Sequence, residues 1–176
     1  MLRLCLFAGF SRVNRVDDYV VHYLRELSKF GDVYYQAANS LDDVELAKLD
    51  GVTLGGWAEP HQKYDFGSWQ KLLFRLGWQE VEKYDVLIFA NDSNYGPLRD
   101  LGNLFEQMEK SDADVWGITE NYGHARHLQS YFMEVNRDVF GSREFREFFE
   151  SIAVEASKQD VCVKYEIGLS QLLTRC

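Results

Sequence analysis

One stretch of the chain joins a buried strand to side chains that can do chemistry. Residues 84–98 read YDVLIFANDSNYGPL, in which an unbroken apolar run, residues 86–90, is followed at once by Asn91, Asp92 and Ser93. Open α/β sheets bind ligands beyond the carboxyl ends of their strands. A carboxylate there can hold a divalent cation that bridges a diphosphate. The alternative is a turn aspartate that accepts backbone N–H groups.

A second group of candidates lies at the start of a predicted helix. Residues 64–69 read YDFGSW, and the apolar spacing predicts a helix over residues 66–76. The helix N-terminus would offer free N–H groups and a positive dipole end. Asp65 is either the N-cap of this helix or a hydrogen-bond acceptor for a base or ribose. Gly67 would permit close approach.

The histidines, cysteines and serines form no recognised catalytic or metal-binding pattern. The four histidines form neither HxH nor HExxH, so solvated or core imidazoles are the favoured interpretation. The three cysteines are widely spaced, and their spacing predicts neither a disulfide framework nor a zinc site. No serine lies in a GxSxG elbow, and the chain has no phosphate-loop or GxGxxG pattern. Acyl transfer, ATP binding and dinucleotide binding therefore lose support.

Strands that alternate with helices must position these candidates. The expected strands are residues 2–8, 32–37, 51–54, 86–90, 114–119 and 127–135, with 161–163 short and extended; 55–64 is an expected loop. The expected helices are residues 18–30, 41–49, 66–76, 98–111, 140–157 and 165–174. This alternation predicts a single three-layer α/β domain over residues 1–176, with a mostly parallel sheet in which residues 127–135 could run antiparallel. Flavodoxin-like proteins, small hydrolases and nucleotide-sugar enzymes share this pattern.

Composition and charge narrow the function classes. A chain of 176 residues that is 46% hydrophobic can bury a substantial core, so disorder is not expected. The net charge of −9 argues against a general nucleic-acid binder but not against a nucleotide ligand. No apolar stretch approaches the roughly 20 residues that span a bilayer. We therefore expect a cytoplasmic protein without a transmembrane segment; peripheral contact with the inner face of the membrane stays open.

Six segments, taken in order, resemble the rhamnan-synthesis F family of polysaccharide glycosyltransferases. They read VDDYVVHYLREL (16–27), YDFGSW (64–69), YDVLIFANDSNYGPL (84–98), VWGIT (115–119), HLQSYF (127–132) and KYEIGLSQ (164–171). The resemblance implies a GT-A-like nucleotide-sugar-binding fold. It also implies an enzyme that moves a sugar, often rhamnose, from a nucleoside-diphosphate sugar to a polysaccharide or glycolipid acceptor in cell-surface polysaccharide synthesis.

On the donor side, the same resemblance assigns roles to both candidate groups. Asn91-Asp92-Ser93 looks like the counterpart of the DxD motif that holds a metal ion, Mg²⁺ or Mn²⁺, and the diphosphate, with one acid in place of two. Asp65, Gly67 and Ser68 belong to the segment that wraps the nucleotide in such folds. The residue before this YDFG segment, one position ahead of Tyr64, is Lys63, where the family usually has glycine.

On the acceptor side, the resemblance assigns four residues. Glu166 resembles the late acidic residue that removes the proton of the acceptor hydroxyl, and it would be catalytic together with Asp92. His127, Gln129 and Ser130 would line the acceptor side. The rival interpretation is a non-catalytic module that binds a saccharide or nucleotide for a larger biosynthetic assembly.

Overall fold

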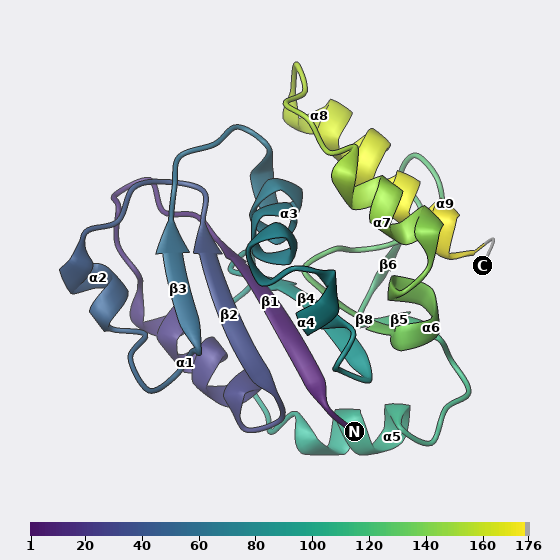
Figure 1. The fold of residues 1–176 in the computed structure, drawn as a ribbon, viewed down its shortest axis with the longest axis horizontal. Helices are drawn as coiled ribbons and strands as arrows, with labels where there is room; N and C mark the ends of the chain where they lie inside the picture. Colours follow the sequence, from purple (N-terminus) through teal and green to yellow (C-terminus); the bar gives the residue numbers. More distant parts are fainter. Residues whose placement is uncertain (175–176) are drawn as a thin grey trace.

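A six-stranded sheet forms the centre of the molecule in the computed structural model, which describes residues 1–174 (Figure 1). Its strands are β1 (Arg3–Gly9), β2 (Asp32–Ala37), β3 (Gly55–Ala58), β4 (Val86–Asn91), β5 (Val115–Gly117) and β8 (Phe132–Asn136). They lie in the order β3-β2-β1-β4-β8-β5. The first four are parallel, and β8 runs antiparallel to both β4 and β5. The predicted mostly parallel sheet is therefore confirmed.

Helices cover both faces of this sheet. They are α1 (Asp18–Ser28), α2 (Asp43–Ala47), α3 (Tyr64–Leu76), α4 (Trp78–Val81), α5 (Gly102–Met108), α6 (Arg137–Phe140), α7 (Arg143–Glu150), α8 (Lys158–Val161) and α9 (Gly168–Leu173); a π-helix, η1 (Cys162–Ile167), joins α8 to α9. Helices α1 and α5 pack on one face, and α3, α7, η1 and α9 pack on the other. None of the helices described within residues 1–174 is long and apolar enough to cross a membrane.

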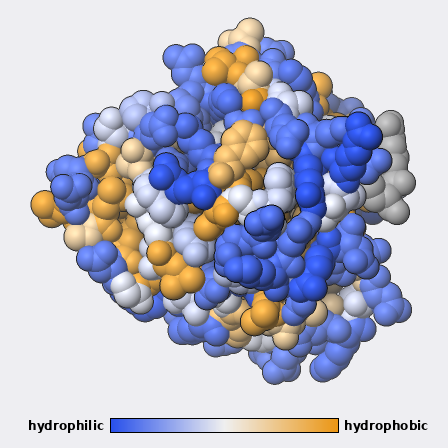
Figure 2. Space-filling model, in the orientation of Figure 1, coloured by the Kyte–Doolittle hydropathy of each residue, from blue (hydrophilic) through white to orange (hydrophobic). Residues whose placement is uncertain are grey.

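Strand β1 shows why the sheet is covered on both sides. All seven of its residues are buried. Its alternate side chains enter two separate cores: Leu4 and Leu6 pack toward α3 and α7, whereas Cys5 and Phe7 pack toward α1 and α5. Successive side chains of a strand point to opposite faces, so an unbroken apolar run requires cover on both. Polar side chains separate the apolar groups on the outer surface that Figure 2 shows.

The strand order reverses between β1 and β4. From β1 the chain moves to β2 and β3 on one side and returns to place β4 on the other. Such a switch point leaves a crevice beyond the carboxyl ends of the two strands. The loops that follow them meet there, because the backbone N–H of Phe10 donates to Oδ2 of Asp92 at 2.7 Å.

The third strand begins later than the sequence predicts. Residues 51–54 were expected as a strand, but they close the turn after α2: Gly51 has a φ of +71°, and the N–H of Val52 bonds to the carbonyl of Leu49. The strand is Gly55–Ala58, which lies in the segment expected as a loop. The apolar residues in 51–54 favoured a strand there, but they lie in the turn. The residues after the turn form the strand, because they are the ones that pair with β2.

The expected strand at residues 127–135 is two strands. Its first part, β7 (His127–Leu128), pairs with β6 (Glu120–Asn121) in a small separate sheet, and its second part is β8. The predicted antiparallel direction of β8 is confirmed. Between them, the N–H of Gln129 bonds to the carbonyl of Thr119 instead of joining the main sheet.

The C-terminal region is divided into more helices than predicted, and residues 151–157, which were expected to be helical, lie outside any helix. The expected helix 140–157 is interrupted near Ser142, whose side chain accepts the N–H of Phe145 and so caps a new helix, α7. Residues 161–163 were expected to be extended, but they lie in the helical run from α8 into η1. Three apolar residues in a row gave a strand-like pattern there. Only Val161 is buried, whereas Val163 is exposed, because the side chains project from different sides of a helix.

Candidate functional site

Asp92 lies directly after β4, at the switch point of the sheet. Besides the bond from Phe10, the hydroxyl of Tyr19 donates to the carbonyl oxygen of Asp92 at 3.0 Å. Burial raises the pKa of the Asp92 carboxyl to about 6. The backbone contact expected of a turn aspartate is present, yet the side chain is also desolvated and lies at the carboxyl edge of the sheet. Perturbed carboxylates in such positions are functional-site candidates.

Asp65 provides a second acid beside the first. It lies in the first turn of α3, and Nδ2 of Asn91 donates to its Oδ2 at 2.9 Å. The other end of the Asn91 amide accepts the N–H of Ser93 at 3.0 Å, so this buried side chain connects the first turn of α3 to the loop after β4. The N-cap position belongs to Lys63, without a side-chain cap bond. The N-cap interpretation of Asp65 is therefore wrong.

The electrostatics of Asp65 link it to both halves of the predicted site. Burial, together with the negative charges of Asp92 and, more weakly, Glu166, raises the pKa of its carboxyl to about 7. Lys158 and the bond from Asn91 act in the opposite direction. Asp65 therefore interacts electrostatically with two other acids, Asp92 and Glu166, and with the ammonium group of Lys158. Without a bound cation these surroundings favour protonation of Asp65, and a bound cation would favour its ionised form.

Gly67 and Ser68 support the loop before α3. A Cβ atom on Gly67 would lie 2.3 Å from Cβ of Lys63 and 2.9 Å from the ring of His61, so only glycine fits under this loop. Ser68 is fully buried, and its hydroxyl lies 3.1 Å from Nε2 of His61. Burial lowers the pKa of His61 to about 4, which keeps the ring neutral at this contact. Contact of Gly67 or Ser68 with a substrate stays a prediction.

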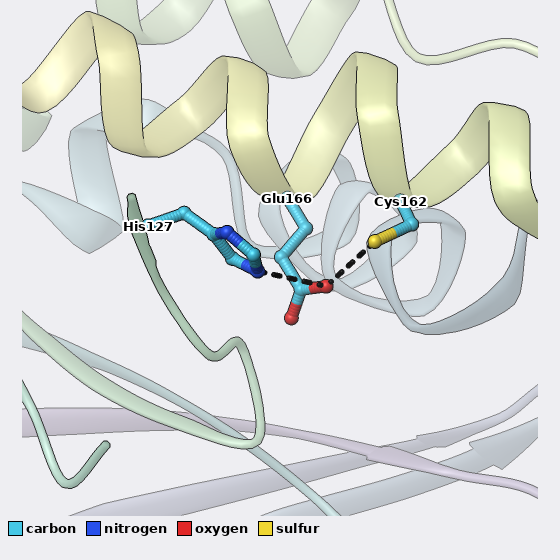
Figure 3. Close-up of side chains that lie close together, drawn as sticks. All are labelled: His127, Cys162 and Glu166. Carbon is cyan, nitrogen blue, oxygen red and sulfur yellow. Dashed lines mark hydrogen bonds and ion pairs between the residues drawn. The ribbon is translucent and has the colours of Figure 1, made fainter. Parts of the chain in front are cut away.

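Glu166 lies at the centre of the residues predicted for the acceptor side. Its Oε1 accepts both the N–H of Ser130, at 2.8 Å, and the hydroxyl of Ser130, at 2.7 Å. Its Oε2 lies 3.1 Å from Sγ of Cys162 and 3.9 Å from Nε2 of His127 (Figure 3). The structure thus brings together three of the residues that the sequence placed on this side. Gln129 turns away from them, because its side-chain carbonyl accepts the hydroxyl of Thr119 at 2.7 Å.

Two residues of this region were missed by sequence reasoning. Lys158 opens α8 after Ser157, whose hydroxyl accepts the N–H of Asp160, and this S-x-x-D capping pattern could have revealed the helix start. Cys162 stands four residues before Glu166, a spacing that places both on one face of a helix. The extended conformation expected for residues 161–163 hid that relation.

Comparisons with known proteins identify a structural neighbour and a family. The fold is similar to the crystal structure of core-mannan synthase A from Aspergillus fumigatus in its Mn/GDP form, with a TM-score of 0.41 and 9% identity, over 95% of this chain and 69% of that chain. At these values the likeness carries no argument about chemistry. No match is found among curated proteins. The family described as rhamnan synthesis protein F matches residues 37–175, most of the chain. The chain therefore belongs to the rhamnan synthesis protein F family, as the resemblance of its six segments predicted.

Proposed function

We propose that the chain is a nucleotide-sugar-dependent glycosyltransferase, which works as a single domain of the GT-A type. It would transfer a sugar, with rhamnose the first to test, to a polysaccharide or glycolipid acceptor in cell-surface polysaccharide synthesis. Membership of the rhamnan synthesis protein F family supports a glycosyltransferase role. The observation that carries the proposal is the pair of desolvated carboxylates, Asp65 and Asp92, at the switch point of the sheet.

The donor side fits a divalent cation and a diphosphate. Mg²⁺ commonly keeps several waters and is held by one or two carboxylates together with substrate phosphates. Asp92 and Asp65 offer such oxygen ligands, and the exposed ammonium group of Lys158 lies in the same field. When bound, Mg²⁺ or Mn²⁺ would supply positive charge that stabilises the departing nucleoside diphosphate. Asn91 would hold Asp65 in position through its amide.

The acceptor side fits a general base. In the proposed reaction Glu166 takes the proton of the acceptor hydroxyl, the acceptor oxygen bonds to the anomeric carbon, and the bond from that carbon to the diphosphate breaks. Ser130 fixes the orientation of the carboxylate by donating two hydrogen bonds to one oxygen. The other oxygen stays directed toward His127 and Cys162.

Asp92→Asn tests the donor side. With the charge removed and the shape kept, we expect the metal-dependent thermal stabilisation by nucleoside diphosphates and their sugars to be lost. Asp50→Asn removes one negative charge from an exposed loop and should retain that stabilisation. The assay is a thermal-shift screen with and without Mn²⁺. Undiminished nucleotide-sugar binding and turnover in Asp92→Asn would refute the central assignment.

Glu166→Gln tests the acceptor side. The amide oxygen can still accept the bonds from Ser130, so we expect donor binding to be unchanged. Sugar transfer should fall by about 10²–10⁴-fold, the usual contribution of a general base. Transfer at the wild-type rate would exclude Glu166 as the base.

A second candidate function is a non-catalytic module that binds a saccharide or nucleotide, and the contacts of the Glu166 carboxylate favour it. Both oxygens of Glu166 accept hydrogen bonds within the protein, as a structural carboxylate would. Stabilisation by one nucleotide sugar, without transfer to any offered saccharide acceptor and with Glu166→Gln binding as wild type, would favour the module.

A further inference from the structure

We propose that His127, Cys162 and Glu166 form a binding site for Zn²⁺, separate from the oxygen ligands at Asp65 and Asp92. Within residues 1–174 these three form the one group of at least three histidine, cysteine or acidic side chains whose ligand atoms all lie close enough to share an ion, within 4.8 Å of one another. Figure 3 shows the three side chains converging from β7 and from successive turns of η1.

The ligand distances fit one tetrahedral ion. Zinc bonds to nitrogen, oxygen and sulfur of about 2.0–2.3 Å place neighbouring ligand atoms roughly 3.3–3.8 Å apart. In the protein, Oε2 of Glu166 lies 3.1 Å from Sγ of Cys162 and 3.9 Å from Nε2 of His127. Small side-chain rotations would therefore bring all three atoms to bonding distance.

The histidine is oriented to act as a ligand. Its Nδ1 lies 2.7 Å from the carbonyl oxygen of Ala125, which can only accept, so Nδ1 must carry the hydrogen. In the neutral ring Nε2 then carries a lone pair directed toward Oε2 of Glu166. The lone pairs of Nε2 and of Oε2, 3.9 Å apart, therefore face the same point, where a metal ion could bind both. Backbone carbonyls orient zinc-binding histidines in this way.

The carboxylate and the helix geometry support the same site. Ser130 occupies Oε1 of Glu166 with two hydrogen bonds, which directs Oε2 toward Sγ and Nε2. Cys162 and Glu166 lie on η1, and π-helical turns occur frequently at functional sites. His127 is buried and Glu166 is mostly so, and the site therefore has little competition from bulk water.

The donor set selects zinc over the ions expected at Asp92. Nitrogen and thiolate ligands favour Zn²⁺, whereas Mg²⁺ prefers oxygen alone. Burial and the adjacent Glu166 raise the pKa of the Cys162 thiol to about 11, so in the free protein the thiol is protonated and donates to the carboxylate. Zinc binding would release that proton. Three protein ligands leave the fourth position open to water or substrate.

One consequence rests on the proposed function. Zinc would engage the carboxylate that serves there as the base, so it should inhibit sugar transfer. Binding itself does not depend on that function and can be tested without it.

The test is a titration of the chelator-treated full chain with Zn²⁺ against a chromophoric chelator. We expect one equivalent to bind tightly, and Cys162→Ser to weaken its affinity more than tenfold. Cys176→Ser is the matched control, because it removes a thiol and leaves the three ligands in place. Co²⁺ should give a thiolate-to-metal absorption band in the wild type and in Cys176→Ser, but not in Cys162→Ser.

Two results would overturn the zinc site. One is the absence of a tight equivalent of zinc; the other is zinc binding that Cys162→Ser leaves unchanged, since Cys162 would then not be a ligand. If Cys162→Ser misfolds, Glu166→Gln provides a second test, because the loss of the carboxylate ligand should also weaken the zinc affinity more than tenfold. Zinc binding without any effect on transfer would leave the site standing and count against Glu166 as the base.

Discussion

Replacing Asp65 by Asn should stabilise the free protein above neutral pH and impair the cation-dependent binding of nucleotides. Asn keeps the size of the side chain and an oxygen that can accept the bond from Asn91, so the change mainly removes the charge. The carboxyl pKa of Asp65 is raised because ionisation is costly in a buried position beside Asp92. Without a bound cation, the negative charge of Asp65 should therefore lower the free energy of unfolding.

The magnitude follows from linkage. A group with a raised pKa contributes stability below its unfolded-state value, and that contribution is lost as the pH rises through the folded-state value. For Asp65 this range runs from 3.8 to about 7, which corresponds to at most about 4 kcal/mol. Because the side chain keeps some contact with solvent, we expect roughly 2 kcal/mol at pH 8. For a chain of this size that is about 4–8 °C in Tm.

The assay is denaturant unfolding of wild type and Asp65→Asn, without metal, from pH 4 to pH 8. The difference in unfolding free energy should be near zero at pH 4, rise up to about pH 7 and then level off. Asp50→Asn, an exposed change of the same charge, should show no such profile. An Asp65→Asn difference that is absent, or equal at pH 4 and pH 8, would refute the buried-carboxylate account.

Two further changes test how the site is held. Trp69 is fully buried, and its indole N–H donates to the carbonyl of Ala90 near the end of β4. We expect Trp69→Ala to lower the free energy of unfolding by about 3–5 kcal/mol, and Trp69→Phe to lower it clearly less. Urea unfolding measures both changes. The Gln70 amide donates to the carbonyls of Phe149 and Ile152, so Gln70→Leu should cost about 1–3 kcal/mol in the same assay, and no loss would mean that water replaces both bonds.

The sequence predicted the fold best where one residue pattern decided the outcome. Strands β1, β2 and β4 and helices α1 and α3 lie close to their expected positions, because long apolar runs and regular helical spacing are local properties. Strand β3 was misplaced because its residues are only partly buried, and its position depends on pairing with β2. The order of strands in the sheet, which creates the crevice, is likewise set by packing between distant segments.

For the site, sequence reasoning found the individual acids but not their relation. Asp92 was expected to stand without a second acid. In the structure Asp65 is hydrogen-bonded to Asn91, the neighbour of Asp92, although Asp65 and Asn91 are 26 residues apart in the chain. No local pattern contains that contact, since it depends on how α3 packs against the end of β4. Cys162 was missed for a different reason: its relation to Glu166 exists only if the segment is helical.

Residues 128–130, from the end of β7 into the loop before β8, have an unusual source of backbone hydrogen bonds. The N–H of Leu128 donates to the hydroxyl of Ser170, and the N–H of Ser130 donates to Glu166, so two of their amides are protected by side chains of the C-terminal helices and not by a neighbouring strand. Their hydrogen exchange should therefore report local opening of η1 and α9. Any fluctuation that lifts these helices also frees the loop, which makes the two segments one unit of local stability.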